Sequence, residues 1–530
     1  MEVTEPILEI HVKGTSRQVF PTDFLRNLIS KLTAGKLEEY NVLKSELDAL
    51  RELQREPIAT LCKRFAESWK KSKPHVPMLL HSADPVWGQA SVDQELSALF
   101  SHPLLQRLNF IRQLSFAYLV FPSATHSRLS HTLGVCRLVE TAMSTVFRKD
   151  VIYSRAGSRP IGLRTTDVRK LILTAKAAAL VHDVGHAPFG HALDRFIGFL
   201  DAGNPHVYPD KYYSKLYLRT LLRDCLPPAV EMGRLAAMLD PDTTELTGWD
   251  NFISALIDSP LDLDRMDFLS RDAHMSGLAM GFNCVEALLE RMCPFEEDDQ
   301  IYLAFEHPCS AYVEDLLSSR EKMYVNCYEE PRKLAAERVF TRLVESLVAR
   351  NALAIQDVIL TTDDQILSLI AQATVGSRQE LELLNALLHN VPYVEVHNVD
   401  IDSDDPRVKS WNSIRDKPGM GKRAYVDEPT SWERAIAAAA KLGEEESWQV
   451  LAVVPEHKVR KYAEVEALIL VRDGAGFTAS PVSQVYPEIE DIVNGFRSQR
   501  RKFRVFAHSA LNATQKDAVR AAARDLFGSD

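Results

Sequence analysis

The sequence predicts a mainly α-helical protein with a small C-terminal appendage of α/β or α+β type. Apolar residues recur at helical spacing over 22–72, which is rich in Leu, Lys, Glu and Arg, and over 76–350, where strand-like runs are scarce. The last part of the chain differs. Trp448 to Val454 and Ala467 to Val471 are short apolar runs typical of strands. A closing helix is expected from Ala513 to Phe527.

Four segments are expected along the chain. Residues 1–75 form an N-terminal helical segment, and 76–350 form the helical core. A helical extension and linker occupies 351–420. Its polar end, Asp400 to Arg423, holds five Asp and two Pro, a composition typical of a boundary. A small α/β domain is expected over 421–530. A chain of 530 residues fits this division into several domains.

The composition excludes several classes of protein. The seven cysteines are odd in number and form no CxxC pair, which argues against a disulfide framework and a zinc ribbon and fits a reducing cytoplasm. We see neither a signal peptide nor a membrane-spanning run, so a cytoplasmic protein without membrane contact is expected. A net charge of -11 disfavours general nucleic-acid binding. The basic run RSQRRKFR (497–504) is typical of a solvated face.

Histidine and aspartate residues cluster in three stretches and indicate a metal site. The stretches are HSRLSHTLGV (126–135), VHDVGHAPFGHALD (181–194) and DLDRMDFLSRD (262–272). Imidazole and carboxylate groups together bind a divalent cation such as Mn, Fe, Ni, Zn or Mg. A helix is expected from Asp167 to His182, and Gly185 and Pro188 then favour a loop. The expected metal ligands are His131, His182, Asp183 and Asp264.

The alternative is that these histidines are hydrogen-bonded core residues, because a lone His-Asp dipeptide is common. The surrounding residues favour the metal site. The stretches HPLLQRLNFIRQLSFAYLVFPSATHSRLSHTLGV, HDVGHAPFGH and LDRMDFLSRDAHMSG resemble the HD-domain dNTP triphosphohydrolases, which include the vertebrate SAM-and-HD-domain enzyme and bacterial dGTPase-like proteins. The resemblance runs from about Asp84 to Arg332. It implies an HD-domain helical core and metal binding through the four expected ligands.

The resemblance also implies acid–base residues. His186 and His191 follow the His-Asp pair, and histidine suits proton transfer near neutral pH. The family pattern makes His191 the proton donor for the leaving nucleoside, oriented by Asp194. The family usually has a further histidine in a His-Glu pair, which this chain lacks. His206 is the nearest histidine, and Asp210-Lys211 is the alternative occupant of that place.

The phosphate-binding residues are expected to be arginines near the metal. Arg128 precedes His131 by three residues, so a helix places both on one side. A guanidinium there suits a phosphate oxygen, although a surface ion pair is the alternative. The resemblance adds Arg265 and Arg320 as triphosphate contacts. Arg320 begins a stripe with Tyr324 and Tyr328, which core packing would also explain.

The sugar-binding residues come from the resemblance. It implies that Asp272 binds the 3′-hydroxyl and that Tyr328 lies beside the sugar. Phe268 stands where the family usually has tyrosine, which removes one hydroxyl. Gln113 and Leu114 match family residues that crowd C2′ of the sugar and exclude ribose. The alternative is that Leu114 packs in the core and Gln113 is a surface amide.

The expected reaction is dNTP plus water to deoxynucleoside plus triphosphate, with one divalent metal per site and a further Mg on the triphosphate. No P-loop motif occurs, which disfavours kinase chemistry. The alternative is an HD-family nucleotidase or a phosphodiesterase for a signalling nucleotide, and a third reading is a non-catalytic nucleotide sensor. Nucleotide-pool control and phage defence are both compatible.

The family implies a homotetramer or hexamer and a nucleotide effector between subunits. Two effector-binding residues of the vertebrate enzyme, an Asp and an Arg, align with Ser101 and Asn109 here. A guanine-specific activator is therefore not expected, whereas another nucleotide effector is compatible with the sequence.

Overall fold

The computed structural model describes most of the chain after residue 80 and a hairpin near the N-terminus. The described residues are 8–12, 15–19, 81–193, 209–239, 246–350, 352–353, 358–374, 377–389, 391–401, 403, 405–409, 421–453, 466–497 and 502–528. The helices predicted over 22–72, together with Asp194 and His206, lie outside them. In the hairpin, β1 (Leu8–Val12) pairs antiparallel with β2 (Thr15–Val19).

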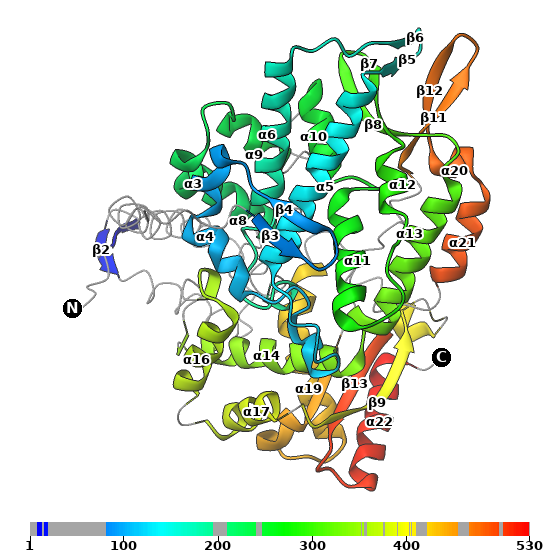
Figure 1. The fold of residues 1–530 in the computed structure, drawn as a ribbon. Helices are drawn as coiled ribbons and strands as arrows, with labels where there is room; N and C mark the ends of the chain where they lie inside the picture. The colour runs from blue at the N-terminus through cyan, green and yellow to red at the C-terminus, as the bar shows by residue number, and fades with distance from the viewer. Residues whose placement is uncertain are drawn as a thin grey trace.

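Three helices form the centre of the molecule (Figure 1). They are α5 (Arg128–Lys149), α6 (Thr165–Val181) and α11 (Leu263–Ser276). α5 packs against both of the others. The end of α6 is buried from Leu173 to Val181 because it carries short apolar and alanine side chains that allow close packing. The helix predicted from Asp167 to His182 is confirmed, as is the mainly helical fold.

Caps place the functional residues of α5 and α11. The Ser127 side chain accepts a hydrogen bond from the Ser130 N–H, and the Asp262 side chain accepts one from the Arg265 N–H at 2.7 Å. α11 ends at Gly277, whose φ of +75° terminates a helix at little cost. The helix predicted from Asp264 is therefore confirmed, and Asp264 lies in its first turn.

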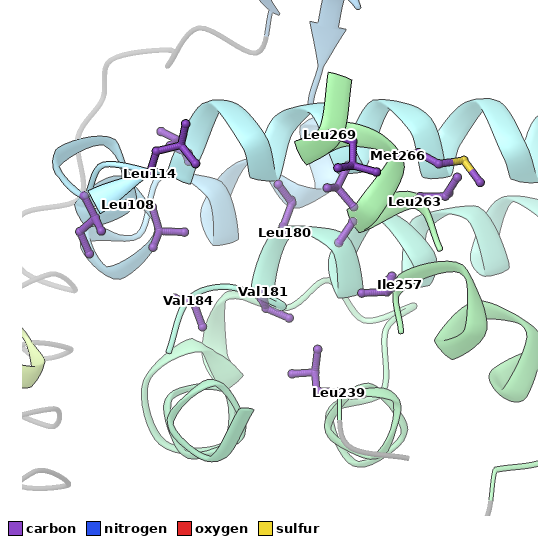
Figure 2. Close-up of a cluster of buried hydrophobic side chains, with 14 of the residues drawn as sticks. Leu108, Leu114, Leu180, Val181, Val184, Leu239, Ile257, Leu263, Met266 and Leu269 are labelled. Carbon is purple, nitrogen blue, oxygen red and sulfur yellow. The ribbon is translucent and has the colours of Figure 1, made fainter. Parts of the chain in front are cut away.

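An apolar core supports the inner ends of these helices. Figure 2 shows Leu180 of α6 near Leu269 of α11, with Leu263 and Met266 on the same helix, whereas Val181 points away from α11. All five side chains are buried. Burying such side chains contributes about 1.5–3 kcal/mol each, so this core fixes the ends of α6 and α11 relative to each other.

Shorter helices and turns surround this centre. The helices are α3 (Ser97–Phe100), α4 (Pro103–Arg107), α8 (Pro209–Tyr217), α9 (Met232–Met238), α10 (Trp249–Ile257), α12 (Val285–Leu289), α13 (Ser310–Met323), α14 (Pro331–Ala349), α16 (Asp363–Ala373) and α17 (Arg378–Leu388). The 3-10 turns are η2 (Gln94–Leu96), η3 (Leu108–Phe110), η4 (Ser115–Leu119) and η6 (Arg223–Cys225). Wider π turns are η5 (Leu218–Leu222) and η8 (Tyr324–Tyr328), and η8 continues α13. Among the described residues no helix is both long and apolar enough to cross a membrane.

A six-stranded sheet joins the core to the C-terminal part of the chain. Its order is β12-β11-β8-β7-β5-β6. The strands are β5 (Ile152–Ser154), β6 (Gly157–Arg159), β7 (Met292–Glu297), β8 (Gln300–Glu306), β11 (Leu468–Asp473) and β12 (Gly476–Pro481). The predicted run Ala467 to Val471 forms β11, which pairs in parallel with β8. The sequence did not indicate the β7–β8 hairpin, whose turn puts Asp298 and Asp299 at positive φ. A small hairpin, β3 (His81–Asp84) with β4 (Gly88–Ser91), lies beside α5.

A second sheet forms the appendage at the end of the chain. Its antiparallel order is β10-β13-β9, with β9 (Tyr393–Asp400), β10 (Val450–Val453) and β13 (Lys502–His508). Alongside lie α19 (Gly421–Ala439), η9 (Glu444–Gln449) and α22 (Ala513–Phe527), whereas α20 (Val482–Val485) packs against β11 and β12 and α21 (Glu488–Arg497) packs against α13. The small sheet and the closing helix are confirmed. The boundary at 421 remains a prediction, since β9 comes from before it and β11–β12 join the core sheet.

Candidate metal centre

Histidine and aspartate side chains from α5, α11 and the end of α6 converge at one point. His131 Nε2 lies 2.9 Å from Asp264 Oδ1 and 3.7 Å from Asp183 Oδ2. His182 Nε2 lies 3.4 Å from Asp183 Oδ1 and 3.9 Å from Asp264 Oδ1. His131, His182 and Asp183 offer ligand atoms that all lie within 4.8 Å of one another. Metal–ligand bonds of about 2.1 Å place neighbouring ligand atoms roughly 3 Å apart and opposite ones about 4 Å apart. His131, His182 and Asp183 therefore could hold one cation, and Asp264 Oδ1 lies within 3.9 Å of both histidines.

Both histidines are oriented for metal binding by their other ring nitrogen. His131 Nδ1 lies 2.7 Å from Asp267 Oδ2, and His182 Nδ1 lies 2.7 Å from the Ala179 carbonyl oxygen. Such contacts fix the tautomer that leaves the Nε2 lone pair free to coordinate. His182 Nε2 is buried and has no hydrogen-bond partner in the described part of the chain. An unpartnered buried acceptor is costly, and a cation would satisfy it.

The electrostatics of the cluster also favour a cation. Burial lowers the pKa of His131, but hydrogen bonds with Asp264 and Asp267 outweigh burial and raise it to about 10. Burial raises the pKa of Asp183, but the charges of His182, His186 and Arg128 hold it well below its usual value. Three carboxylates thus surround His131, and a bound cation would neutralise them.

The glycine at position 134 allows α5 and α11 to approach closely enough for this arrangement. A Cβ added at Gly134 would lie 1.9 Å from Asp267 Oδ1 and 2.2 Å from the Arg271 guanidinium. Arg271 holds Asp267 through two contacts of 2.8 Å and is itself paired with Asp84 at 2.8 Å. Asp267 is thereby fixed beneath His131.

The loop after the ligands carries the predicted acid–base residues. His186 Nε2 lies 3.2 Å from Asp183 Oδ1 and 3.7 Å from Asp210 Oδ2. The His191 ring meets His186 edge-on at 5.0 Å between ring centres, and His191 is exposed to solvent. Asp210 is therefore near His186. The predicted Asp194 and His206 are outside the described residues.

Arg128 and Arg265 lie in different surroundings. Arg128 is buried, and its guanidinium donates to Asp183 Oδ2 at 2.9 Å, directly beside the ligand set. Arg265 donates to the carbonyl oxygens of Ser259 and Pro260 and pairs with Asp262 at 3.1 Å. The phosphate contact of Arg265 remains a prediction. A substrate would have to bind a guanidinium that already donates to the turn before α11.

A second polar cluster lies further along α11. Asp272 is buried, with Oδ1 at 2.8 Å from His126 Nε2 and Oδ2 accepting the Tyr328 hydroxyl at 2.8 Å. The Tyr328 ring lies 6.2 Å from Phe268 and 5.0 Å from Tyr324. The predicted sugar residues on α11 and η8 are therefore neighbours.

The remaining predicted substrate residues border this second cluster. The Arg320 guanidinium carbon lies 5.4 Å from the Tyr324 ring centre. The Gln113 N–H donates to the His126 carbonyl oxygen at 3.0 Å, and Gln113 Oε1 is buried without a hydrogen-bond partner among the described residues. Leu114 is buried. Gln113 is therefore connected to Asp272 through His126, whose carbonyl oxygen contacts Gln113 and whose ring contacts Asp272.

The chain is similar over part of its length to several known proteins. No family model matches the chain. An uncharacterized protein of Bacillus subtilis is 30% identical over 269 residues, covering 49% of this chain and 54% of that protein. A protein of Acanthamoeba polyphaga mimivirus, named as HD domain-containing, is 22% identical and covers 59% of this chain and 65% of its own length. The deoxynucleoside triphosphate triphosphohydrolase SAMHD1 of Mus musculus is 24% identical, covering 62% of this chain and 51% of that enzyme.

The chain is therefore similar, at low identity, to an HD domain-containing protein and to a dNTP triphosphohydrolase. It spans about half the length of the curated relatives it matches, 54% for the Bacillus subtilis protein. A phosphohydrolase of Bacteroides thetaiotaomicron has the same fold, with a TM-score of 0.57, 19% identity, and coverage of 81% of this chain and 99% of its own. A hypothetical protein from Aquifex aeolicus also has a TM-score of 0.57, with 18% identity and coverage of 83% and 99%.

Two supporting contacts of the candidate site were not predicted from the sequence. Asp267 supports His131, and His126 supports Asp272. Asp267 follows Asp264 by one helical turn, and Gly134 follows His131 by the same interval. Those two intervals are the sequence signal for a close α5–α11 contact. His126 precedes the Ser127 cap, and only the return of α11 places Asp272 beside it.

Proposed function

We propose that this protein is a metal-dependent deoxynucleoside triphosphate triphosphohydrolase, converting a dNTP and water to a deoxynucleoside and inorganic triphosphate. The observation that carries the proposal is the pairing of two sites on α11. Asp264 belongs to the metal cluster, and Asp272 to the aromatic cluster with Tyr328. Eight residues separate them, roughly 12 Å of helix, which the side chains and a nucleotide can bridge.

The chain's own residues suit each part of this reaction. Arg128 lies beside the metal ligands and would bind a phosphate oxygen as a planar donor. Arg320, with Tyr324, would bind the triphosphate further out. A divalent ion held by the four ligands would supply Lewis-acid chemistry and lower the pKa of a bound water. His191 is exposed beside His186 and would give a proton to the leaving nucleoside oxygen.

The relatives support the same reaction class. The mammalian relatives are named deoxynucleoside triphosphate triphosphohydrolases, and one protein of similar fold is named a phosphohydrolase. The metal identity, a further Mg on the triphosphate, a homo-oligomer, a nucleotide effector and a role in nucleotide pools or phage defence remain predictions.

The experiment that tests this proposal compares deoxy- and ribonucleotides. We expect kcat/KM for dATP to exceed that for ATP by at least about tenfold, because an unmatched buried hydroxyl costs about 1–3 kcal/mol. Leu114→Ala should narrow the ratio by opening space near C2′. Leu108→Ala is the matched control, because Leu108 is a buried leucine of the same segment (Figure 2) that has no predicted sugar contact.

Equal turnover of dATP and ATP by the unaltered protein would contradict the dNTP substrate. Such a result would favour the nucleotidase alternative, which uses the same metal ligands. A Leu108→Ala variant that changes the ratio as much as Leu114→Ala would contradict the role given to Leu114.

A further inference from the structure

The loop that follows the metal ligands has an unusual backbone. Phe189 and Gly190 are consecutive residues with φ of +56° and +50°. A bulky residue is rarely found in the left-handed region, and it persists there only when its surroundings hold it. The Phe189 side chain is fully buried, stacked on Phe116 at 4.2 Å between ring centres and edge-on to Phe340 at 4.8 Å. The ring contacts fix its side chain, so a separate contact must fix its backbone.

That backbone contact comes from the start of α16. Asp363 Oδ1 accepts the Phe189 N–H at 2.7 Å, and Asp363 Oδ2 accepts the Arg112 N–H at 2.9 Å. The Asp363 side chain is 1% exposed. Hydrogen bonds from backbone N–H groups to a buried carboxylate are charge-assisted and strong. One carboxylate therefore ties the loop to the segment that carries the predicted Gln113.

Arg107 of α4 holds the loop at a second point and also bonds the residues just before α16. The Arg107 guanidinium donates to the carbonyl oxygen of His186 at 2.6 Å, and also to those of Ile359 at 2.8 Å and Thr361 at 2.9 Å. Arg107 is buried. The loop is thus fixed at His186 by Arg107 and at Phe189 by Asp363, and both contacts depend on residues 359–363.

The other side of the loop lies against Arg128. A Cβ added at Gly190 would come within 2.3 Å of the Arg128 guanidinium. Arg128 in turn donates to the metal ligand Asp183. A shift of this loop would therefore disturb the predicted phosphate contact together with His186 and His191.

We propose that Asp363 is a positioning residue for this loop, acting with Arg107 to hold His186 and His191 in register with the metal ligands. Among the described residues, the hydrogen bonds of Asp363 go to Phe189 and Arg112 and to none of the four metal ligands. The expected effect on turnover rests on the proposed function, whereas the role of Asp363 in holding the loop does not.

The kinetic test uses Asp363→Ala with Asp364→Ala as the matched control. Asp364 is the next residue, 83% exposed, and faces the same Arg112 at 4.0 Å. In the full chain loaded with Mn²⁺, Asp363→Ala should lower kcat for dATP by about 10- to 100-fold, since small displacements of catalytic groups cost rates of this order. Bound Mn²⁺ should stay within about twofold, and Asp364→Ala should match the unaltered protein.

A conservative variant separates positioning from a general loss of stability. Asp363→Asn retains one acceptor oxygen, so it should keep an intermediate kcat at a temperature where all variants are folded. Loss of Mn²⁺ binding in parallel with kcat, or the same loss of kcat in Asp364→Ala, would overturn the positioning role.

Hydrogen–deuterium exchange tests the clamp independently of turnover. Peptides covering 184–193 should exchange faster in Asp363→Ala and Asp363→Asn than in the unaltered protein, and no faster in Asp364→Ala. If the unaltered protein does not hydrolyse dATP, the proposed function is wrong. The exchange rates would still test whether Asp363 holds the loop. Unchanged exchange in both Asp363 variants would overturn the clamp, and faster exchange with full kcat would overturn its role in positioning.

Discussion

At the scale of single residues, Asp267 shows how a side chain outside the ligand set can govern the metal centre. It accepts from His131 Nδ1 and from Arg271, and the Trp87 indole N–H reaches its other oxygen. Burial raises the pKa of Asp267, but the charge and hydrogen bonds of Arg271 outweigh burial and lower it to about 2. Asp267 therefore stays ionised and makes His131 a more basic ligand.

We predict that Asp267→Asn weakens metal binding by about 10- to 100-fold without removing a ligand. Asparagine keeps the size of the side chain but loses the negative charge beneath His131. Titration of the metal-free protein with Mn²⁺ by calorimetry measures the change. Asp84→Asn is the control, because Asp84 bonds Arg271 and the Trp87 backbone N–H, two residues that also contact Asp267, and should have a smaller effect than a change at Asp267 itself. Equal affinities for Asp267→Asn and the unaltered protein would refute the supporting role.

The sequence could indicate the ligands but not their supports. His131, His182 and Asp183, named from their spacing, are the residues that the structure gathers within 4.8 Å. The spacing of Asp267 put it on the helix face of Asp264 and Asp272, but the supporting roles of Asp267 and His126 were not predicted, because their contacts depend on how closely α11 crosses α5. Asp363 lies far along the chain from the loop it holds, and nothing in the local pattern around it indicates that contact.

At the scale of secondary structure, the start of α4 depends on a histidine. His102 Nδ1 accepts the Leu104 N–H at 3.2 Å and caps the helix, with Pro103 in its first turn. An acceptor nitrogen must be unprotonated. Burial lowers the pKa of His102 to about 4. Its folded pKa is therefore below the value of about 6.5 expected in the unfolded chain.

We predict that His102 makes stability pH-dependent between about 6.5 and 4. Its contribution is fully present above about pH 6.5 and is lost as pH falls through that window, since the unfolded chain then binds the extra proton. The loss is on the order of 3 kcal/mol. His102→Asn supplies a neutral cap, so its melting temperature should fall less between pH 6.5 and 4.5 than that of the unaltered protein. Parallel melting curves for the two proteins would contradict this account.

The sequence predicted helices better than strands. The helix patterns ending at His182, beginning at Asp264 and closing the chain are confirmed because each has an apolar stripe, and α11 and α22 also begin with a side-chain cap. The β7–β8 hairpin was missed because its turn, Asp298-Asp299, lacks the glycine that usually marks such turns. The π turn at η8 was also missed, although it directs Tyr328 toward Asp272.

At the scale of the whole molecule, one buried acid joins the C-terminal appendage to the core. Glu433 of α19 is fully buried and contacts Arg338 of α14 at 2.7 Å and Arg342 at 3.0 Å. Its Oε1 also accepts the Ala452 N–H of β10 at 2.9 Å. The Glu433 carboxylate therefore connects α14, which precedes residue 421, with α19 and β10, which begin at or after it.

We predict that Glu433→Gln destabilises the protein by about 3–5 kcal/mol, because it removes the carboxylate paired with the buried Arg342 guanidinium and one of the two carboxylates paired with Arg338, whose other partner is Glu345. Urea unfolding measures the loss, and Arg434→Ala, an exposed neighbour on α19, is the control. The two variants should differ clearly in their unfolding midpoints. Equal midpoints would show that this ion pair does not join the two parts.

The central claim, triphosphate release at a metal centre, is tested most directly by the products of dATP hydrolysis. The purified protein with Mn²⁺ should give deoxyadenosine and intact triphosphate in equal amounts, separated by ion-exchange chromatography. The variant His182→Ala with Asp183→Ala should give neither product, while remaining folded and binding no Mn²⁺, because it lacks two of the four ligands. Pyrophosphate with dAMP, stepwise release of single phosphates, or full activity in the double variant would contradict the account.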